Sequence, residues 1–514
     1  MGRLTLSLIV KNEEKYLKGC LDSVMGIIDE IILVDTGSTD RTKEIAARYE
    51  AKIFDYEWKN DFAAARNFAL SKTTGDWILY LDADERLTKE SIAEIKMIIA
   101  NDKRIGVNCI VRSTDQTTQN TYSIYYPRLF KYHKSIRFQG KVHEQIIQSL
   151  FRSGYRMVNS KILINHLGYD VDISEKKEKA LRNLSILLAE YNELNSDYYA
   201  FQLANTYKTL DDSKNAKEYY QKVIDSKTLN RHYVAIAASS LAYISLEEKN
   251  FTEAENYIEK SLTINNHSSY SNLLAAKISF GLNNTEEAIK YSLKSLEISK
   301  SPKNTEALSI QINREEVIYF GLLISYLSNN KMFFDRFWLE LKHEIRHRMN
   351  YDKTISYIQQ LLTGKKPISF SYGVFKSVYN NFNSLFIQKL ISQLKDIDFR
   401  IELLENMEKD FNEDSIYKEL AKAYSEKGLV EKAIEIFEKR GRKNLDAAEL
   451  LYLLSFYLQS NNSEVAAGII EVIEEKYKSY PQIIERIAPL KKKILNSTKL
   501  FNEAYDNISE SKSQ

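Results

Sequence analysis

The first hundred residues alternate between short apolar runs and amphipathic helical patterns. Helical spacing of apolar residues is found at 12–24, 38–49 and 61–73. The β-rich runs lie at 4–10, 30–35, 51–56 and 77–82. Strands that alternate with helices form βαβ units, because parallel strands need a crossover connection. This part of the chain is therefore predicted to be an α/β domain built on a parallel sheet.

Polar residues follow three of these runs directly. Asn12 and Glu14 come after the first run, Asp35 ends the second, and Asp82 and Asp84 follow the fourth. Because the carboxyl ends of parallel strands lie at one edge of a sheet, we expect these side chains to converge in one crevice.

The pair of Asp82 and Asp84 has two interpretations. An isolated D-x-D is usually an acidic turn before a helix, here expected at about 89–100. At a sheet edge, two aspartates can instead present Mg²⁺ or Mn²⁺ to a diphosphate, since these cations bind oxygen ligands and often share substrate phosphates. Such a cation would neutralise the charge of a departing phosphate.

Residues after about 105 form a different set of apolar runs, at 107–114, 122–130, 136–146 and 161–169. We expect mixed or antiparallel strands here that close one side of the crevice. Nine of the sixteen glycines lie in residues 1–168, so turns should be more frequent in this part than in the rest.

From about residue 175 the chain is helical and repetitive. A small residue recurs on the second helix of each repeat, and a small or apolar residue lies twelve positions before it on the first helix. The second-helix positions are Ala216, Ala254, Ala288, Ala433 and Ala466, and the first-helix positions are Ala204, Ala242, Ala276, Ala421 and Leu454. This pattern resembles the tetratricopeptide repeat, in which small residues let paired helices pack closely. The repeats cannot be assigned between 303 and 410.

Composition restricts the partners and the compartment. Lysine and arginine number 72 against 70 acidic residues, so the net charge of +2 gives no reason to expect a nucleic-acid partner. Cys20 and Cys109 cannot form a disulfide framework, which favours a reducing compartment. We also expect no membrane span, because no apolar run reaches about 18 residues. A cytoplasmic, bacterial protein is predicted.

Four ordered motifs identify a family. "SLIVKNEEKYLKGCLDSV", "IILVDTGSTDRT", "ARNFAL" and "WILYLDADE" resemble the nucleotide-sugar-binding half of family 2 glycosyltransferases with the GT-A fold. The resemblance covers roughly residues 4–170. It implies a Rossmann-like sheet, a nucleoside-diphosphate sugar donor, most often a UDP-sugar, a Mn²⁺ or Mg²⁺ cofactor and inversion at the anomeric carbon.

The resemblance also implies roles for single residues. Residues expected to bind the nucleotide-sugar are Val10, Asn12, Glu14, Asp35, Arg66, Asp82 and Arg128. Asp84 is expected to bind the metal directly, with Asp82 and His166 beside it. Each has a plainer alternative: Glu14 and Asp35 could interact with helix dipoles, and Arg66 could lie on a helix surface. Thr36 stands where many relatives have a second aspartate, which weakens the assignment of Asp35.

A general base is also needed, to take the proton of the acceptor. Glu144 in "FQGKVHEQI" is expected to be this catalytic base, at the start of a helical pattern, with His143 in a supporting role. For a lone histidine, such as His166, the plainer alternative is a satisfied core or surface group.

The motifs "YEWKNDFAAARN", "RLFKYHKSIRFQGKVHE" and "NHLGYD", with helical repeats after them, resemble the sublancin-type peptide S-glycosyltransferases over roughly residues 5–225. The resemblance implies transfer of a sugar to a Ser, Thr or Cys side chain of a peptide or protein held by the repeats. One alternative is a transferase for cell-surface polysaccharide or lipooligosaccharide, and another is a non-catalytic repeat scaffold. The repeats could also form a homodimer.

The predicted organisation has four parts. Residues 1–172 form the GT-A catalytic domain, 173–300 form tetratricopeptide-like repeats, 301–410 form helices without assigned repeats, and 411–514 form further tetratricopeptide-like repeats. The fold class is thus an α/β GT-A domain followed by an all-α helical-repeat solenoid.

Overall fold

The computed structural model describes most of the chain in two compact units, 1–341 and 342–514. The described ranges are 2–100, 103–115, 120–167, 173–300, 308–348, 350–366, 370–460, 462–478, 483–485 and 487–492. The predicted boundary at 172 and the first residues of the predicted segment from 301 lie outside them.

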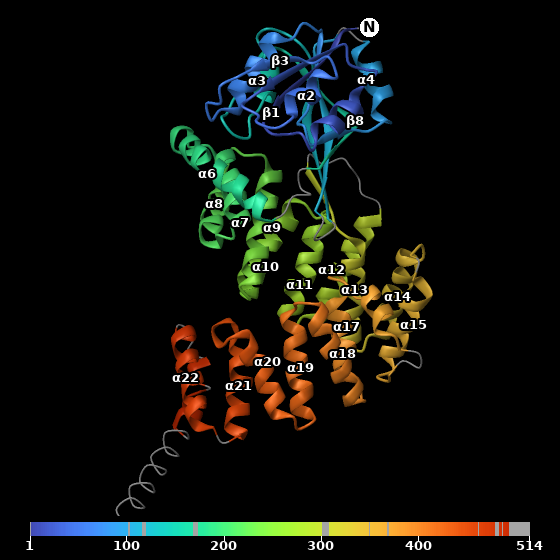
Figure 1. Ribbon diagram of the computed structural model, residues 1–514, viewed down its shortest axis with the longest axis vertical. Coiled ribbons are helices and arrows are strands. Elements are labelled where there is room, and N and C mark those ends of the chain that lie inside the picture. The colour runs from blue at the N-terminus through green and yellow to red at the C-terminus, as the bar shows by residue number, and fades with distance from the viewer. Residues whose placement is uncertain are drawn as a thin grey trace, which may run out of the picture. The chain divides into compact units, whose positions relative to one another are not determined.

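The N-terminal strands form the predicted parallel sheet (Figure 1). These strands are β1 (Leu4–Val10), β2 (Glu30–Asp35), β3 (Lys52–Asp55) and β4 (Trp77–Tyr80). Alternate side chains point to opposite faces, so Leu33 packs with Leu6 on one face while Ile32 and Val34 pack with Ala69 on the other. Both faces are buried, which explains why these strands are nearly continuous apolar runs.

The remaining strands extend this sheet as a mixed sheet, as predicted. They are β5 (Glu85–Leu87), β6 (Ile105–Thr114), β7 (Thr121–Lys131), β8 (Arg156–His166) and β9 (Leu308–Gln311). The order is β3-β2-β1-β4-β7-β6-β8-β5, with β7 antiparallel to β4 and β6, and β9 paired with β7.

Five helices cover the sheet: α1 (Leu17–Val24), α2 (Thr42–Ala47), α3 (Phe62–Lys72), α4 (Ser91–Ile99) and α5 (Ile147–Arg152). Leu17 of α1, Ala46 of α2 and Ile95 of α4 share one core cluster, whereas Ala69 and Leu70 of α3 belong to the clusters of the opposite face. The sheet therefore lies between two helical layers.

The prediction of a strand at 136–146 is wrong. The segment is a loop with one isolated bridge between Gln139 and Gln145. Gly140 and His143 have positive φ angles of 95° and 54°, and each breaks the extended path. Glu144 consequently lies in this loop and does not begin a helix, since α5 starts at Ile147.

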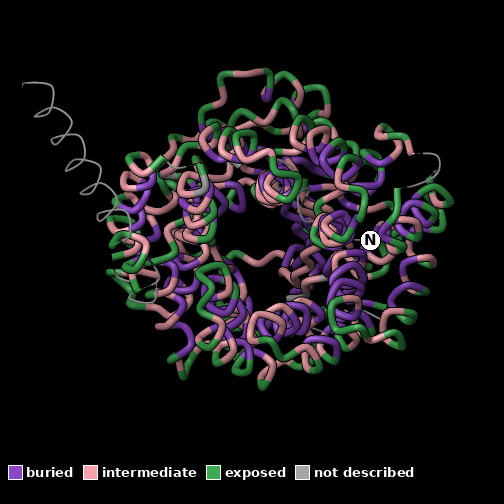
Figure 2. The backbone as a smooth tube through the Cα atoms, turned by 90° about the horizontal axis from the view of Figure 1, so that it is seen from below, coloured by how far each residue is buried: buried purple, intermediate pink, exposed green. Residues whose placement is uncertain are grey.

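Helical hairpins follow the sheet in the first unit. The helices are α6 (Ile173–Leu194), α7 (Asp197–Thr209), α8 (Ser213–Asp225), α9 (Arg231–Glu247), α10 (Phe251–Ile264), α11 (Ser269–Gly281), α12 (Thr285–Lys300), α13 (Arg314–Leu327) and α14 (Lys331–Ile345). The turns between helices are mostly exposed and the packed faces buried (Figure 2). The predicted small positions of the first three repeats, Ala204, Ala216, Ala242, Ala254, Ala276 and Ala288, are completely buried.

The secondary-structure elements in the described residues of the second unit are all helices. Its helices are α15 (Tyr351–Leu362), α16 (Tyr372–Val378), α17 (Ser384–Ser392), α18 (Ile397–Asp410), α19 (Asp414–Glu426), α20 (Val430–Arg440), α21 (Ala447–Gln459) and α22 (Ser463–Tyr477). The predicted repeat positions Ala421, Ala433, Leu454 and Ala466 are all fully buried. Small residues thus occupy the helix contacts in both units.

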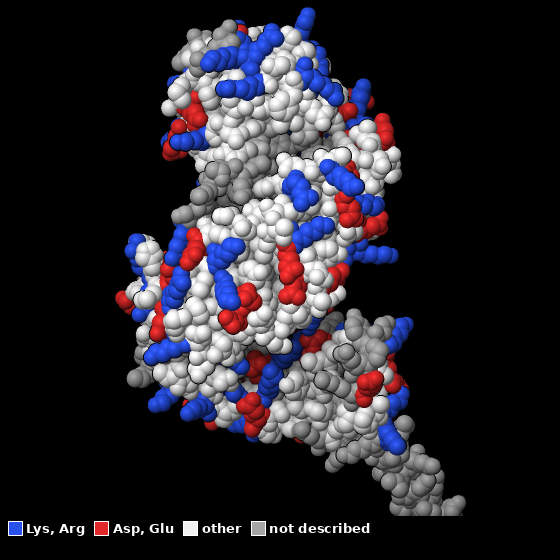
Figure 3. Space-filling view, turned by 180° about the vertical axis from the view of Figure 1, so that it is seen from behind, with Lys and Arg blue, Asp and Glu red and all other residues white. Residues whose placement is uncertain are grey.

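Basic and acidic side chains are both present on the face of the protein seen from behind (Figure 3).

Of the helices in the described ranges, none combines the length and apolar composition needed to cross a membrane.

Candidate active site

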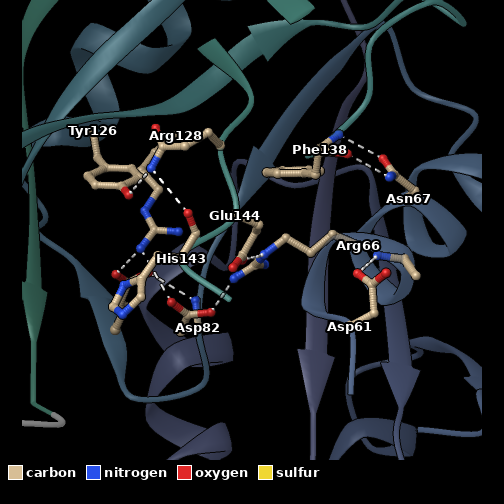
Figure 4. Close-up of polar contacts among 12 residues, drawn as sticks. Asp61, Arg66, Asn67, Asp82, Tyr126, Arg128, Phe138, His143 and Glu144 are labelled. Carbon is tan, nitrogen blue, oxygen red and sulfur yellow. Dashed lines mark hydrogen bonds and ion pairs between the residues drawn. The ribbon is translucent and has the colours of Figure 1, made fainter. Parts of the chain in front are cut away.

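Arg66 is placed by the first turns of α3. The Asp61 side chain caps this helix by accepting a hydrogen bond from the Ala64 backbone N–H at 2.8 Å. Arg66 Nη2 then donates to Asp82 Oδ1 at 2.7 Å, and its Nε donates to Glu144 (Figure 4). Its side chain is 7% exposed, so the alternative of a helix-surface arginine is wrong.

Arg128 reaches the same carboxylate from β7. The register of β7 with β6 shifts between Val107, which pairs with Leu129, and Asn108, which pairs with Pro127, so Arg128 itself is the extra residue of β7. Arg128 Nη2 lies 2.6 Å from Glu85 Oε1 and 3.3 Å from Asp82 Oδ2. Asp82 therefore lies between two guanidinium groups (Figure 4).

Aromatic rings line the two arginines. The Tyr80 ring lies 5.0 Å from Arg66 Cζ and 4.7 Å from Arg128 Cζ, and Phe138 and Tyr126 lie beyond them at 5.6 Å each. Rings at these distances attract cations and limit the access of water. The positive charges are thus held in fixed positions.

The network contains more negative than positive groups. Two arginines face three carboxylates, those of Asp82, Glu85 and Glu144. Burial opposes ionisation of Asp82, but the two arginines lower its pKa. Burial raises the pKa of Glu85 to about 7; Arg128 acts against this shift and Asp82 adds to it. A site with this excess of acid can take up one further cation or proton.

Asp84 and His166 form a second pair at the same edge. The antiparallel pairing of β5 with β8 sets His166 opposite Glu85, and His166 Nε2 lies 3.3 Å from Asp84 Oδ2. Its Nδ1 lies 3.3 Å from Ser113 Oγ, which orients the ring. Burial lowers the pKa of His166, but the hydrogen bond and charge of Asp84 outweigh it, so the pKa is raised.

This pair fits a divalent cation that shares its ligands with a substrate. Asp84 and His166 are 20% and 26% exposed, so both can be reached. Across the described ranges, no group of three or more His, Cys, Asp or Glu side chains is arranged to hold a metal by itself. Mg²⁺ typically binds through one or two carboxylates with the remaining positions filled by water and phosphate. Both oxygens of Asp82 already accept from arginines.

The loop that carries Glu144 is held by α3 on the N-terminal side of Glu144. Phe62 N–H donates to the Lys141 carbonyl at 2.8 Å, and the Asn67 amide is paired with the backbone of Phe138. The Glu144 side chain is 14% exposed. The His143 side chain is exposed to solvent. The protein around it still removes enough water to lower its pKa.

The other predicted nucleotide ligands organise the loop at 36–41. Asn12 Oδ1 accepts from Thr39 N–H at 2.8 Å, and Glu14 Oε2 accepts from Arg41 N–H at 3.1 Å. Asp35 is fully buried and accepts from the backbone of this loop at 2.7–2.9 Å. These three residues therefore lie together at the ends of β1 and β2, and their role toward a nucleotide stays a prediction.

Val10 and Thr36 complete this edge. Val10 is buried, and its carbonyl accepts from both the N–H of Thr36 at 2.9 Å and its hydroxyl at 3.1 Å. Val10 can present only backbone to a ligand here. Thr36, which occupies the position of a second aspartate in many relatives, uses its hydroxyl for this hydrogen bond.

The sequence does not predict roles for three further residues of this site. Glu85 is the buried partner of Arg128. Burial, followed by the charge of Asp84, raises the pKa of Glu13 to about 7, so Glu13 adds another acid near that edge. Gln145 links the loop to two tyrosines. The burial of Glu85 depends on a strand of three residues, which is too short to recognise by its pattern.

Two parts of the chain match known families. Residues 6–163 match "Glycosyl transferase family 2". Residues 198–228, 237–268 and 269–302 match the tetratricopeptide repeat.

Two curated relatives match part of the chain. A "TPR repeat-containing protein" of Synechococcus elongatus is 37% identical over 202 residues, which are 38% of this chain and 50% of the relative. The prophage-derived glycosyltransferase SunS of Bacillus subtilis is 30% identical over 264 residues, 50% of this chain and 62% of the relative. The chain thus spans between half and about two thirds of these relatives.

Solved structures match smaller parts. Glucosyl-3-phosphoglycerate synthase from Mycobacterium tuberculosis has a TM-score of 0.20 at 22% identity, covering 22% of this chain and 44% of that one. MamA from Desulfovibrio magneticus has a TM-score of 0.28 at 13% identity, covering 34% and 95%. These TM-scores are too low for the solved structures to bear on function. From its matches along the sequence, the chain carries a domain of glycosyl transferase family 2 followed by tetratricopeptide repeats.

Proposed function

We propose that the protein is an inverting, metal-dependent glycosyltransferase. It moves a sugar from a UDP-sugar to a Ser, Thr or Cys side chain of a peptide or protein acceptor. The observation that carries this proposal is the arrangement at the carboxyl edge of the sheet, where Arg66 joins Asp82 to Glu144 beside the pair of Asp84 and His166. This site contains an arginine that can bind an anion, the Asp84–His166 pair that can bind a cation, and the Glu144 carboxylate that can accept a proton.

The arginines suit a diphosphate. Arg66 and Arg128 are both held by Asp82, and Arg128 also by the buried Glu85, so their charges are oriented before a ligand arrives. Asp84 and His166 would hold a divalent cation that, when bound, neutralises the developing charge of the leaving diphosphate. The match of residues 6–163 to glycosyl transferase family 2 supports a nucleotide-sugar as the source of that diphosphate.

Glu144 suits the role of general base. Its carboxylate accepts from Arg66 and retains a 14% exposed edge from which it can reach a bound acceptor. The acceptor oxygen or sulfur attacks the anomeric carbon, its proton passes to Glu144, and the bond from that carbon to the diphosphate oxygen breaks. One displacement of this kind inverts the configuration.

The repeats suit a polypeptide acceptor. Stacked helix pairs form an extended surface along which a peptide can lie. Residues 198–302, which match tetratricopeptide repeats, begin close to the loop of Glu144, since Tyr198 contacts Gln145.

The first experiment measures donor and cation together. The purified protein is screened against a panel of nucleotide-sugars by thermal shift, with and without Mn²⁺, and the best donor is then tested for hydrolysis and for transfer to peptides. We expect a UDP-sugar to raise the melting temperature only with the cation, by linkage to the folded state. Absence of both the shift and hydrolysis with every donor would contradict an enzyme and favour a scaffold.

Acceptor identity decides the rest of the proposal. Transfer to peptides is expected, and transfer only to lipid or oligosaccharide acceptors would favour a role in cell-surface polysaccharide or lipooligosaccharide synthesis.

Removal of the cation ligand gives a second test. We expect Asp84→Ala to reduce metal-dependent turnover by at least about a hundredfold, because a missing charge interaction in the transition state costs several kcal/mol. Asp225→Ala removes an exposed aspartate of α8 and should leave turnover unchanged. Circular dichroism checks that both variants keep their helices. Full activity of Asp84→Ala would show that the metal assignment is wrong.

A further inference from the structure

The loop of the candidate base is joined to the first repeat helix by one side chain. Gln145, next to Glu144, donates from Nε2 to Tyr126 Oη of β7 and to Tyr198 Oη of α7, each at 2.8 Å. The amide therefore fixes a strand of the sheet and a helix of the repeats at the same point. A molecule at Glu144 would meet both elements.

Two side-chain contacts between α7 and α9 extend from this point. The rings of Tyr198 and Tyr233 lie 6.1 Å apart at an interplanar angle of 84°, and Lys208 Nζ lies 5.2 Å from the centre of the Tyr243 ring. Ten residues separate the two positions on each helix. At 1.5 Å per residue the two contacts are about 15 Å apart along the helices.

Further tyrosines continue this surface toward the start of β7. Tyr122 pairs with Ile310 of β9, and the Ile310 carbonyl accepts from Ser269 Oγ, next to Tyr270 of α11. We use the name tyrosine surface for the set Tyr122, Tyr126, Tyr198, Tyr233, Tyr243 and Tyr270 together with Lys208.

Every member of the tyrosine surface is in contact with solvent. All are partly exposed, Tyr243 most clearly at 38%. Surrounding protein nevertheless raises the pKa of Tyr198, Tyr233, Tyr243 and Tyr270, with burial as the first cause in each. Side chains that are shielded but still reachable are suited to covering a ligand laid over them.

Lys208 is unusual within this set because no acid accompanies it. Within the described part of the chain it forms no ion pair, and its polar contact is the Tyr243 ring. Burial alone lowers its pKa, with no carboxylate acting in the opposite direction. A shielded ammonium without a counter-charge favours an anionic ligand.

We propose that the tyrosine surface binds the acceptor as an extended polypeptide and that Lys208 selects an acidic residue in it. This inference rests on the proposed function and deepens it. The acceptor residue lies at Glu144 beside Gln145, and the peptide runs along α7 and α9 toward Lys208. An extended chain covers about 3.3 Å per residue, so about five residues span the 15 Å between the two contacts.

The geometry of the rings favours a polypeptide over a glycan. Sugars stack on the open flat face of an aromatic ring, but Tyr198 and Tyr233 stand edge to face, so the edge of one ring covers a face of the other. The Tyr198 hydroxyl is engaged with Gln145, which leaves the Tyr233 hydroxyl and the ring edges for a peptide backbone and its side chains.

The test measures peptide binding without sugar transfer. Short fluorescent peptides carry a central alanine in place of the acceptor residue and a single Asp moved one position at a time to either side, with a matched set carrying Lys. Affinity is measured by fluorescence anisotropy for the wild type, Lys208→Glu and Lys208→Met. Lys260→Glu of α10 is the control, because it makes the same charge change at an exposed position.

We expect wild-type protein to bind best when Asp lies about five residues from the centre, by about tenfold over Lys at that position. Lys208→Glu should reverse this preference, Lys208→Met should abolish it, and Lys260→Glu should retain it. The same preference in wild type and Lys208→Glu, or tight binding by acidic oligosaccharides but not by peptides, would overturn the inference.

Donor hydrolysis by the wild type separates this inference from the proposed function. Metal-dependent hydrolysis of a UDP-sugar without any charge preference among peptides would reject the role of Lys208 and leave sugar transfer standing. A charge preference without hydrolysis would reject the transferase while retaining the peptide site.

Discussion

Arg66 makes the stability of the sheet domain depend on its candidate active site. The guanidinium is 7% exposed and serves Asp82 and Glu144 at once. Removing this buried cation leaves Glu144 without its arginine and Asp82 with Arg128 alone, which costs far more than the pair itself contributes.

We therefore expect Arg66→Met to lower the free energy of unfolding by about 3–5 kcal/mol. Urea denaturation followed by tryptophan fluorescence measures the change. Arg48→Met, at an exposed position at the end of α2, should stay within about 0.5 kcal/mol of the wild type. A loss below about 1 kcal/mol for Arg66→Met would mean that the carboxylates find other partners.

Glu30 gives the sheet a defined acid sensitivity. Its buried carboxylate accepts from Thr5 Oγ1 at 2.7 Å, from Thr74 N–H and Oγ1 at 2.9 Å, and from Lys52 Nζ at 2.8 Å. Burial opposes ionisation, but the hydrogen bonds of Lys52, Thr74 and Thr5 outweigh it and lower the pKa of Glu30 to about 2.

Because this pKa is below the unfolded value of 4.5, the stabilisation from Glu30 is complete above that pH and is lost as the pH falls toward 2. We expect Glu30→Gln to be less stable than the wild type at neutral pH, and the difference to shrink by up to about 1.4 kcal/mol per pH unit below about pH 4.5. Urea denaturation at several pH values measures it. A difference that is constant with pH would refute the role of the ionised carboxylate.

For single residues, the sequence predicts which ones lie in the site when they belong to a motif. It does not predict residues that reach the site through contacts between distant parts of the chain. Arg66, Asp82, Arg128 and Glu144 were predicted together and lie together. The burial of Glu85 follows from strand pairing that no local pattern contains.

Helices that follow the matched repeats also depend on small residues at their contacts. Gly321 of α13 has no side chain where a Cβ would lie 2.4 Å from the ring of Phe337, which is fully buried in α14. Gly373 of α16 is also helical but exposed, and a Cβ there would meet nothing nearer than 4.0 Å.

Alanine should therefore have opposite effects at these two glycines. We expect Gly321→Ala to destabilise the protein by about 1–3 kcal/mol, because overpacking exceeds the gain in helix propensity. Gly373→Ala should stabilise it by up to about 1 kcal/mol, because only the propensity changes. Thermal or urea denaturation compares them, and equal effects at both sites would contradict the packing argument.

Among the elements, the sequence predicts the periodic ones best. The strands at 4–10 and 30–35 match β1 and β2 in their bounds. The segment 136–146 has the composition of a strand but folds as a loop, since left-handed residues and contacts with α3 and α6 outweigh its β propensity.

At the scale of the first unit, β9 joins the repeats to the sheet. This strand lies between α12 and α13 in the chain and pairs with β7 through four residues, 308–311. Asn313 N–H adds a hydrogen bond of 2.8 Å to Asn120 Oδ1. A pairing across such a distance in sequence has no local signal, which is why it was not predicted.

The substitution Ile310→Pro should disrupt the pairing of β9 with β7. Proline has no backbone N–H to donate and restricts φ, so the strand can no longer pair. We expect the amides of 308–311 and their partners at 121–124 to exchange hydrogen at least about tenfold faster, measured by mass spectrometry. Ile310→Ala keeps the backbone and should preserve protection. Unchanged exchange in the proline variant would show that β9 contributes nothing to the junction.

The strand also limits how this protein could be recombined with its relatives. A chimaera joined at the end of the α/β domain would lose the pairing of β7 with β9. It would also lose the hydrogen bond between Gln145 and Tyr198, even if both pieces fold. A crossover point after β9 would keep both contacts, but the tyrosine surface would then remain with the original chain, so grafting a foreign solenoid there should leave the acceptor preference unchanged.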